Sequence, residues 1–189
     1  MGKKIYRIAL AFITVALLLS ILWPYEQKLI DWDRAPDYRV LESDEIYFNN
    51  TRIVSYRTDE SSELTEQGFK THRSTKALSD TTVPFVNFTI VNNWRSDQAY
   101  VVMEPSHRKF FRDETLVYCG SDTLRFDLDH MDFESHYELA ATLFKHSLDY
   151  HRPFIYDGKD SLLLYGTQGN EKANTTVLKD YFRLIGRFQ

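Results

Sequence analysis

The densest group of side chains that could do chemistry lies between residues 127 and 136, in the sequence DLDHMDFESH. Carboxylate oxygens and imidazole nitrogens gathered this closely are suited to holding a divalent metal ion. The candidate metal ligands are Asp127, Asp129, His130, Asp132 and His136. One hypothesis for the protein is therefore a metal-dependent hydrolase that uses this cluster.

The same residues also have an ordinary structural interpretation. A strand that ends near Leu128 and a helix that begins after Asp132 would place acidic side chains in the first helical turn, where the helix dipole favours them. An EF-hand is excluded because the segment has no glycine for the sharp turn of that loop. The metal site and the helix start both remain open at this point.

A second group of chemically interesting residues is the sequence HRKFFR at positions 107–112, where two phenylalanines lie between basic residues. Such a segment is suited to contact with an acidic partner or an anionic membrane surface. A Trp-Arg pair at 94–95 has the composition of an interface hot spot. The candidate contact residues are Trp94, Arg95, Arg108, Lys109, Phe110, Phe111 and Arg112. Burial of the two phenylalanines beneath a solvated loop is the structural alternative.

The common catalytic and phosphate-binding signatures are missing. The sequence contains no H-E-x-x-H, G-x-S-x-G or Walker A motif, and with 7 glycines it has little material for a phosphate loop. The only cysteine, Cys119, permits no intramolecular disulfide and no cysteine-based zinc site. We expect Cys119 to be buried as a small apolar residue. No cofactor is predicted.

These residues follow an apolar N-terminal segment, Ile8 to Trp23, which contains no charge. Its length falls between that of a signal peptide core and that of a membrane-spanning helix. No small residues form a cleavage site after it, so we predict an uncleaved anchor over residues 8–25. A cleaved signal peptide and a buried helix are the alternatives. The predicted membrane-interface residues are Lys3, Lys4, Arg7, Trp23, Tyr25 and Trp32.

Charge indicates the orientation of this anchor. Lys3, Lys4 and Arg7 are the only basic residues before the apolar segment, so residues 1–7 are expected in the cytoplasm and the remainder across the membrane. Of the 23 basic residues three precede the segment, and all 27 acidic residues follow it, so the exported part carries a formal charge of −7. That charge argues against nucleic-acid binding, which needs a positive surface.

The middle of the chain has the composition of β-strands. Alternating apolar and polar residues predict strands at 83–92, 99–104, 115–119 and 123–128, and a weaker pattern predicts one at 68–73. Residues 46–57 read as a hairpin or as one long bulged strand, and residues 58–66 as a loop. Asp157-Gly158 predicts a hairpin turn within residues 154–165.

Two later segments have helical periodicity. Apolar residues recur every three or four positions from Phe133 to Asp149, behind a predicted Asp132 N-cap. A second apolar stripe runs from Thr175 to Phe188, with Asn174 or Thr175 as its cap. The order of elements predicts an α+β fold in which one antiparallel sheet of about six to eight strands carries both helices on one face. A β-sandwich or partial barrel capped by the two helices is the alternative.

The predicted organisation is a short basic N-terminus (1–7), an anchor (8–25), a juxtamembrane connector (26–44) and an extracytoplasmic domain (45–189). With no recognisable catalytic set, the leading hypothesis is a non-enzymatic, membrane-anchored domain that binds another envelope protein as an assembly or accessory subunit. The alternatives are the metal-dependent hydrolase and a domain that binds a small apolar ligand.

Overall fold

The computed structural model describes residues 2–22, 30–32, 34–59, 61–79, 82–111, 114–156 and 160–188. Its helices are α1 (Gly2–Leu22), α2 (Glu42–Tyr47), α3 (Ser62–Glu66), α4 (Phe133–Leu148) and α5 (Gln168–Leu184). Its strands are β1 (Tyr56–Asp59), β2 (Phe69–Ser74), β3 (Val86–Asn93), β4 (Gln98–Pro105), β5 (Thr115–Cys119), β6 (Asp122–Phe126), β7 (Phe154–Tyr156) and β8 (Ser161–Leu163). A π-helical turn, η1 (Phe48–Arg52), and two 3-10 turns, η2 (Ile53–Ser55) and η3 (Leu128–His130), complete the set.

The fold is α+β with antiparallel strands, as predicted, but the strands form two sheets instead of one. The first sheet has the order β1-β2-β3-β4 and the second has the order β6-β5-β7-β8. The chain leaves β4 at Pro105, which has no amide hydrogen to donate to a further strand. It then buries Phe111 completely before β5 begins. The expectation of a single sheet was wrong at this point.

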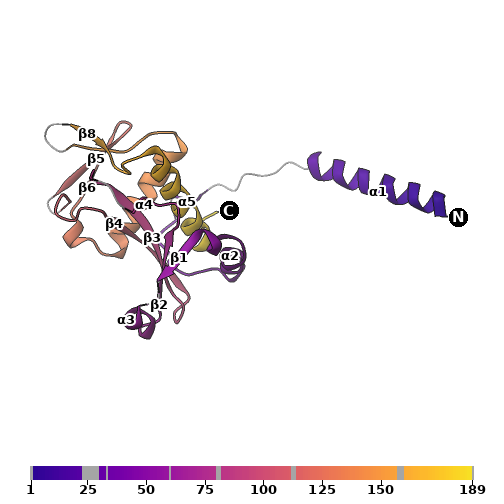
Figure 1. The fold of residues 1–189 in the computed structure, drawn as a ribbon, viewed down its shortest axis with the longest axis horizontal. Coiled ribbons are helices and arrows are strands. Elements are labelled where there is room, and N and C mark those ends of the chain that lie inside the picture. The colour runs from indigo at the N-terminus through magenta and orange to yellow at the C-terminus, as the bar shows by residue number, and fades with distance from the viewer. Residues whose placement is uncertain are drawn as a thin grey trace.

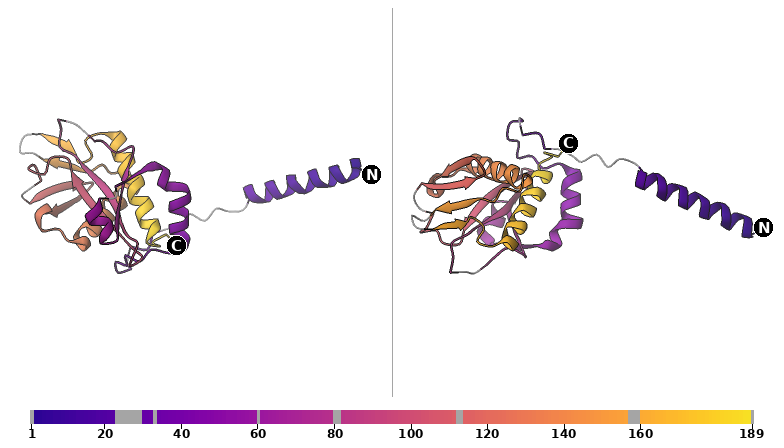
Figure 2. Two further views of the ribbon diagram at one scale, coloured as in Figure 1. Left: turned by 60° about the horizontal axis from the view of Figure 1, so that its bottom comes forward. Right: turned by 90° about the horizontal axis from the view of Figure 1, so that it is seen from above.

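The helices cover the first sheet in layers. Helix α5 packs on β2, β3 and β4, and α2 packs on the opposite side of α5. Figure 2 shows α5 between the strands and the helical segment that begins with α2. Helix α4 contacts β4, β6 and α5, so it joins the two sheets (Figure 1). One continuous cluster of buried apolar side chains includes residues of both sheets and of α4 and α5.

The strand predictions in the middle of the chain are confirmed with small shifts of their ends. Val86, Phe88 and Ile90 are at most 1% exposed and share one face of β3. Their register partners in β4 include Met103 and Val101, which are equally buried. The predicted turn at residues 157–158 lies outside the described residues.

Residues 46–57 are largely helical, which corrects the predicted hairpin. The chain forms α2, then η1 and η2, and becomes a strand only at Tyr56. Acidic residues in the first turn of α2 favour a helix start there. The β-prone composition misled the prediction because Phe48, which is buried, lies on a helical turn, where its ring packs against those of Tyr56 and His72. Likewise, the expected loop at 58–66 contains the end of β1 and α3.

Helix α5 begins seven residues before the predicted start, with Thr167 as its N-cap. The predicted caps were wrong because Asn174 lies inside the helix and is 1% exposed. Its side-chain oxygen accepts a hydrogen bond from Phe88 N (2.6 Å), and the oxygen of Asn170 accepts one from Leu78 N (2.9 Å). The amide nitrogens of Asn170 and Asn174 both donate to Asn87 Oδ1, at 2.9 and 3.2 Å. These three asparagines satisfy the amide of Phe88 in β3 and both backbone groups of Leu78, which follows β2.

The expected connector is packed against the folded part. Ile30 forms a β-bridge with Phe188, and the ring of Trp32 contacts those of Phe144 and Phe182 edge-on, at 6.3 and 5.5 Å between centroids. Arg187 is 1% exposed and donates hydrogen bonds to the carbonyl oxygens of residues 31, 34 and 35. Trp32 therefore packs against α4 and α5, and its membrane-interface role stays a prediction.

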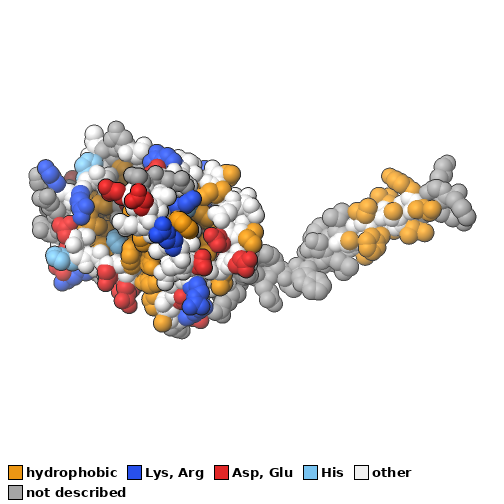
Figure 3. All heavy atoms as spheres, turned by 90° about the horizontal axis from the view of Figure 1, so that it is seen from below, with side chains coloured by type: hydrophobic (Ala, Val, Ile, Leu, Met, Phe, Trp, Pro, Cys, Tyr) orange, Lys and Arg blue, Asp and Glu red, His pale blue; other side chains and the backbone are white. Residues whose placement is uncertain are grey.

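Helix α1 stands apart from the other elements (Figure 1). The side chains that the structure describes on it are exposed and mainly apolar on the face shown in Figure 3, with Arg7 also exposed. Within the part of the chain that the structure describes, no helix has the length and apolar character needed to span a bilayer. Trp23, Tyr25 and the side chains of Lys3 and Lys4 lie outside the described part of the chain.

Replacing Asn174 with alanine tests the asparagine cluster. The change leaves the amide of Phe88 buried without its acceptor, so we expect the free energy of unfolding to fall by about 1–3 kcal/mol. Denaturant titration measures this change. Asn50→Ala is the matched control because Asn50 is exposed, and we expect less than about 0.5 kcal/mol there. Equal effects of the two exchanges would contradict a special role for the cluster.

Candidate functional site

The acidic segment at 127–136 is divided between a turn and the start of α4. Asp127 is the N-cap of η3, where its carboxylate accepts a hydrogen bond from Asp129 N at 3.1 Å. The other oxygen of Asp127 lies 2.7 Å from Nδ1 of His130. The hydrogen bond to His130 is the main reason that the pKa of Asp127 lies below its usual value. Asp129 instead pairs with Arg108, at 3.2 Å.

Asp132 and His136 have other partners. Asp132 caps α4, as predicted, and accepts hydrogen bonds from both the backbone nitrogen and the hydroxyl of Ser135, at 2.8 and 2.7 Å. These bonds lower the pKa of Asp132. His136 is 8% exposed, and its Nδ1 accepts a hydrogen bond from Met103 N at 3.3 Å. Burial lowers the pKa of His136, with Asp132 acting weakly in the opposite direction.

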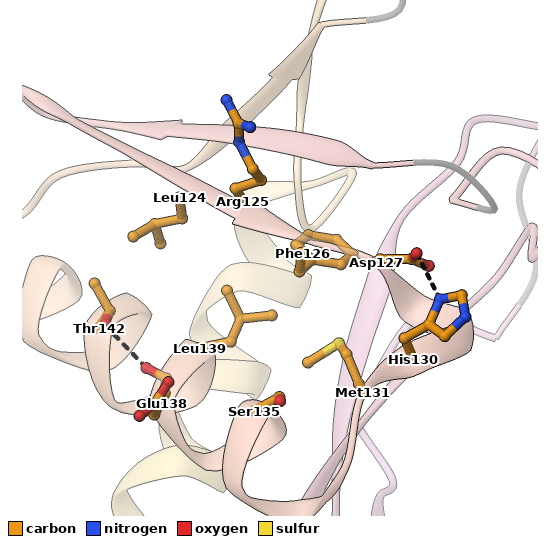
Figure 4. A pocket seen from close by; sticks show the side chains of 10 residues that line it. All are labelled: Leu124, Arg125, Phe126, Asp127, His130, Met131, Ser135, Glu138, Leu139 and Thr142. Carbon is orange, nitrogen blue, oxygen red and sulfur yellow. Dashed lines mark hydrogen bonds and ion pairs between the residues drawn. The ribbon is translucent and has the colours of Figure 1, made fainter.

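A hollow of about 350 Å³ lies between β6 and α4 beside these residues (Figure 4). Its floor is apolar, since Leu124, Met131 and Leu139 gather between the strand and the helix, whereas Arg125 extends to the other side of β6. Asp127 and His130 stand together at one end of the hollow.

The polar groups of this hollow do not converge on a common point. Catalysis by a nucleophile and base needs a hydrogen-bonded pair of the two, with a third group that orients the base. Here His130 is paired with Asp127, but the hydroxyl of Ser135 donates to Asp132. Among the residues that the structure describes, no group of three or more His, Cys, Asp or Glu side chains is placed to hold a metal ion. The five predicted ligands are thus not brought together.

Comparison with known proteins adds no guide to the site. No protein-family model, curated protein or solved structure matches this chain.

The HRKFFR segment is split between core and surface. Phe111 is fully buried and stacks near Phe126, at 6.4 Å between centroids, so its predicted role as an exposed contact was wrong. Phe110 is half-buried, Lys109 is exposed, and both line a second hollow, of about 480 Å³. Arg108 is held by Asp129, and Arg112 lies outside the described residues.

The predicted Trp-Arg pair lies at the other end of the first sheet, in the turn between β3 and β4. Trp94 is 48% exposed, and the guanidinium of Arg95 lies 5.3 Å from the centre of its ring. This stacking holds an exposed indole in place. Neither side chain lines the hollow beside Asp127 or the hollow beside Lys109.

The hollow beside Lys109 belongs to the outer face of the second sheet. In the register of this sheet, Tyr118 lies opposite Phe154, and Leu116 is two residues from Tyr118 on the same face of β5. Tyr156 is two residues from Phe154 on the same face of β7. Tyr118, Phe154 and Tyr156 are 43, 37 and 57% exposed, respectively. We call Lys109, Phe110, Leu116, Tyr118, Phe154 and Tyr156 the aromatic face.

Sequence reasoning missed the tyrosines of the aromatic face, although the signal was present. A period of two in residues 115–119 puts Val117 inside and Tyr118 outside, and residues 154–156 place Ile155 inside. What the sequence did not reveal is that β5 and β7 are neighbours, which is the fact that joins these side chains into one surface.

Cys119 is fully buried, as predicted. Burial raises the pKa of its thiol to about 11, with the charges of Asp122 and Glu171 adding to the effect. The thiol is therefore protonated near neutral pH, and it is unsuited to act as a nucleophile because the thiolate is the reactive form.

The buried imidazole of His136 makes stability depend on pH. Because folding lowers its pKa, the unfolded chain binds a proton more readily, and stability is lost as pH falls below the ordinary histidine pKa of about 6.5. His136→Asn keeps an acceptor for Met103 N but cannot titrate in this range. We expect denaturant titrations at pH 7.5 and 5.5 to show a smaller loss of stability in this variant than in the native chain. His130→Asn is the control for removing one histidine, and an unchanged loss in His136→Asn would contradict the assignment.

Proposed function

We propose that the protein is a membrane-anchored, non-enzymatic binding subunit whose aromatic face takes up an apolar segment of another protein of the same envelope. The observation that carries the proposal is the row of exposed aromatic side chains on neighbouring strands of the second sheet. Tyrosine and phenylalanine are enriched in the centres of protein interfaces, where they contribute much of the binding energy.

The structure of the aromatic face supports a protein ligand. Four of its six side chains stand on β5 and β7, whose opposite sides are buried at Val117 and Ile155, so these four are presented with little conformational freedom to lose. Immobilising side chains that are already restricted costs less entropy on binding. The hollow of about 480 Å³ offers a recess for one apolar side chain or a short run of them.

Charges around the aromatic face provide a polar rim. Lys109 lines the hollow with Glu114, whose carboxylate lies 3.0 Å from Arg125. Rim charges of this kind contribute to association rate and selectivity more than to affinity. An apolar centre with a charged rim is typical of a surface that binds a protein segment. It is less typical of a surface that contacts only solvent.

The membrane part of the proposal rests on the N-terminal sequence. Residues 8–23 are uncharged and apolar, and Lys3, Lys4 and Arg7 precede them. These features favour a signal-anchor with a cytoplasmic N-terminus and an extracytoplasmic folded part, and in this proposal the aromatic face meets other envelope proteins.

Photo-crosslinking from the aromatic face tests the protein-binding function. With a photoreactive phenylalanine at position 156 of the full-length chain, we expect one discrete crosslinked protein in membranes. The exchange Tyr118→Ser should remove a central contact that contributes about 2 kcal/mol of binding free energy. At limiting partner concentration the yield of crosslinked protein should then fall roughly thirtyfold. Mass spectrometry and quantitative blotting measure identity and yield.

Tyr150 provides the matched control because it is 93% exposed and lies outside the aromatic face. A probe at position 150 should give no discrete adduct, and Tyr150→Ser should leave the adduct from position 156 unchanged. Equal crosslinking from both positions, or an adduct insensitive to Tyr118→Ser, would contradict the proposal.

Alkaline extraction tests the anchor separately. Val15→Arg with Leu18→Arg puts two cations near the middle of the apolar segment, which costs about 5–7 kcal/mol of insertion free energy. We expect the native chain in the membrane pellet and this variant in the supernatant, as measured by blotting. Ile46→Arg with Val54→Arg adds the same charge at exposed positions and should remain in the pellet. Release of the native chain would rule out the anchor.

A further inference from the structure

A third surface, unrelated to the aromatic face, concentrates positive charge on this acidic chain. It is a hollow of about 330 Å³ lined by Arg52 of η1, Lys76 in the turn after β2, and Lys172 of α5, together with Ser55, Ser74 and Thr176. No acidic side chain lines it within the described part of the protein. We call it the cationic hollow. The whole chain has a formal charge of −4, so three cations around one recess run against its overall charge.

Arg52 is fixed in place by a partner behind the hollow. Its Nε lies 2.9 Å from both oxygens of Asp180, and the hydroxyl of Tyr56 donates to the same carboxylate at 2.7 Å. Burial alone would lower the pKa of Arg52, but the hydrogen bond and charge of Asp180 outweigh it and raise the pKa. The guanidinium is therefore charged and held rigidly. Its contacts with Asp180 use Nε and Nη2, which directs Nη1 away from that pair.

The two lysines supply the net charge of the hollow, since Asp180 balances Arg52. Lys76 and Lys172 are exposed, and the structure shows no ion pair for either among the described residues. The acid next to Lys172 in sequence, Glu171, pairs instead with Arg152, at 3.5 Å. Two ammonium groups facing one recess repel each other, and an anion placed between them relieves that repulsion.

The hydroxyl of Ser74 adds a donor of the right kind, whereas that of Thr176 already donates to the carbonyl oxygen of Lys172 at 2.8 Å. Ser74 Oγ accepts a hydrogen bond from Lys76 N at 3.3 Å, so its own hydrogen is directed elsewhere. Guanidinium, ammonium and hydroxyl donors together match the several acceptor oxygens of a phosphate group, and the charged donors form the stronger bonds. A recess of about 330 Å³ is at the lower end of the range for small-molecule sites.

We propose that the cationic hollow binds a phosphate group, with Lys76 and Lys172 neutralising its charge and Arg52 orienting it. The site shares no residue with the aromatic face, so it extends the activity of the protein beyond the function proposed above. The phosphate group can come from a free phosphate or phosphate ester, or from the phosphodiester of a lipid headgroup.

Titration calorimetry on the full-length chain in a non-ionic detergent tests this proposal. Inorganic phosphate is the probe for the free source, and glycerophosphoglycerol, a water-soluble phosphodiester headgroup, is the probe for the lipid source. We expect saturable binding of at least one probe, weakened at least tenfold by the paired exchange Lys76→Gln and Lys172→Gln. Raising the ionic strength from 50 to 300 mM should also weaken it.

The paired exchange Lys145→Gln and Lys179→Gln removes the same charge at exposed positions outside the hollow, and it should leave binding unchanged. Tighter binding of inorganic phosphate would assign the free source, and tighter binding of glycerophosphoglycerol would assign the headgroup. The proposal is overturned if neither probe binds at 10 mM, or if the control exchange weakens binding as much as the exchange in the hollow. Thermal unfolding of each variant verifies that both pairs remain folded.

Discussion

The structure depends on the burial of α5 together with several polar side chains that it carries. This helix lies between the first sheet and α2, so its polar groups lose water on both sides and must find partners within the protein. Asn170 and Asn174 form hydrogen bonds with backbone groups of residue 78 and of β3. Asp180 accepts hydrogen bonds from Arg52 and Tyr56. Each partner segment is thereby attached to α5 at a defined place.

This arrangement also links the folded core to the proposed sites. Asp180 is buried and holds Arg52 in place. Arg52 is therefore the cation of the cationic hollow that is fixed to the core. The aromatic face has a different origin, because it is the outer side of strands whose inner residues complete the same apolar cluster. One core therefore supports two surfaces of different chemistry, one apolar with a charged rim and the other cationic.

The sequence predicted those parts of the fold in which local pattern and tertiary environment agree. Residues 115–119 form a strand with the predicted bounds, and α4 begins behind Asp132 as expected, because periodicity and capping are local properties. Residues 46–57 were mispredicted because Phe48 is buried on a helical turn, while β-branched residues such as Ile46 and Val54 are exposed on helical segments. The early start of α5 was not predicted because the sequence Gln-Gly-Asn at residues 168–170 is typical of a loop. Only the structure shows that Asn170 binds a backbone group, the amide of Leu78.

The candidate sites were less predictable than the elements, for a related reason. The density of acids at 127–136 is visible in sequence, but the direction of each side chain depends on the turn η3 and on the start of α4. The aromatic face and the cationic hollow join residues that are distant in the chain, such as Tyr118 with Tyr156 and Arg52 with Lys172. Their proximity is a property of sheet order and helix packing.

The attachment of residues 30–35 to the C-terminal end of the chain has a mechanical consequence. A pull on the chain at Ile30 meets the bridge to Phe188 and the hydrogen bonds of Arg187 to three carbonyl groups. These contacts share the load, and Arg187, adjacent to α5 and stacked near Tyr137, passes it into the core. Tension applied at the N-terminal side is thus transmitted to the most deeply buried helix before it reaches the bridge between Arg39 and Gln98 at the start of β4.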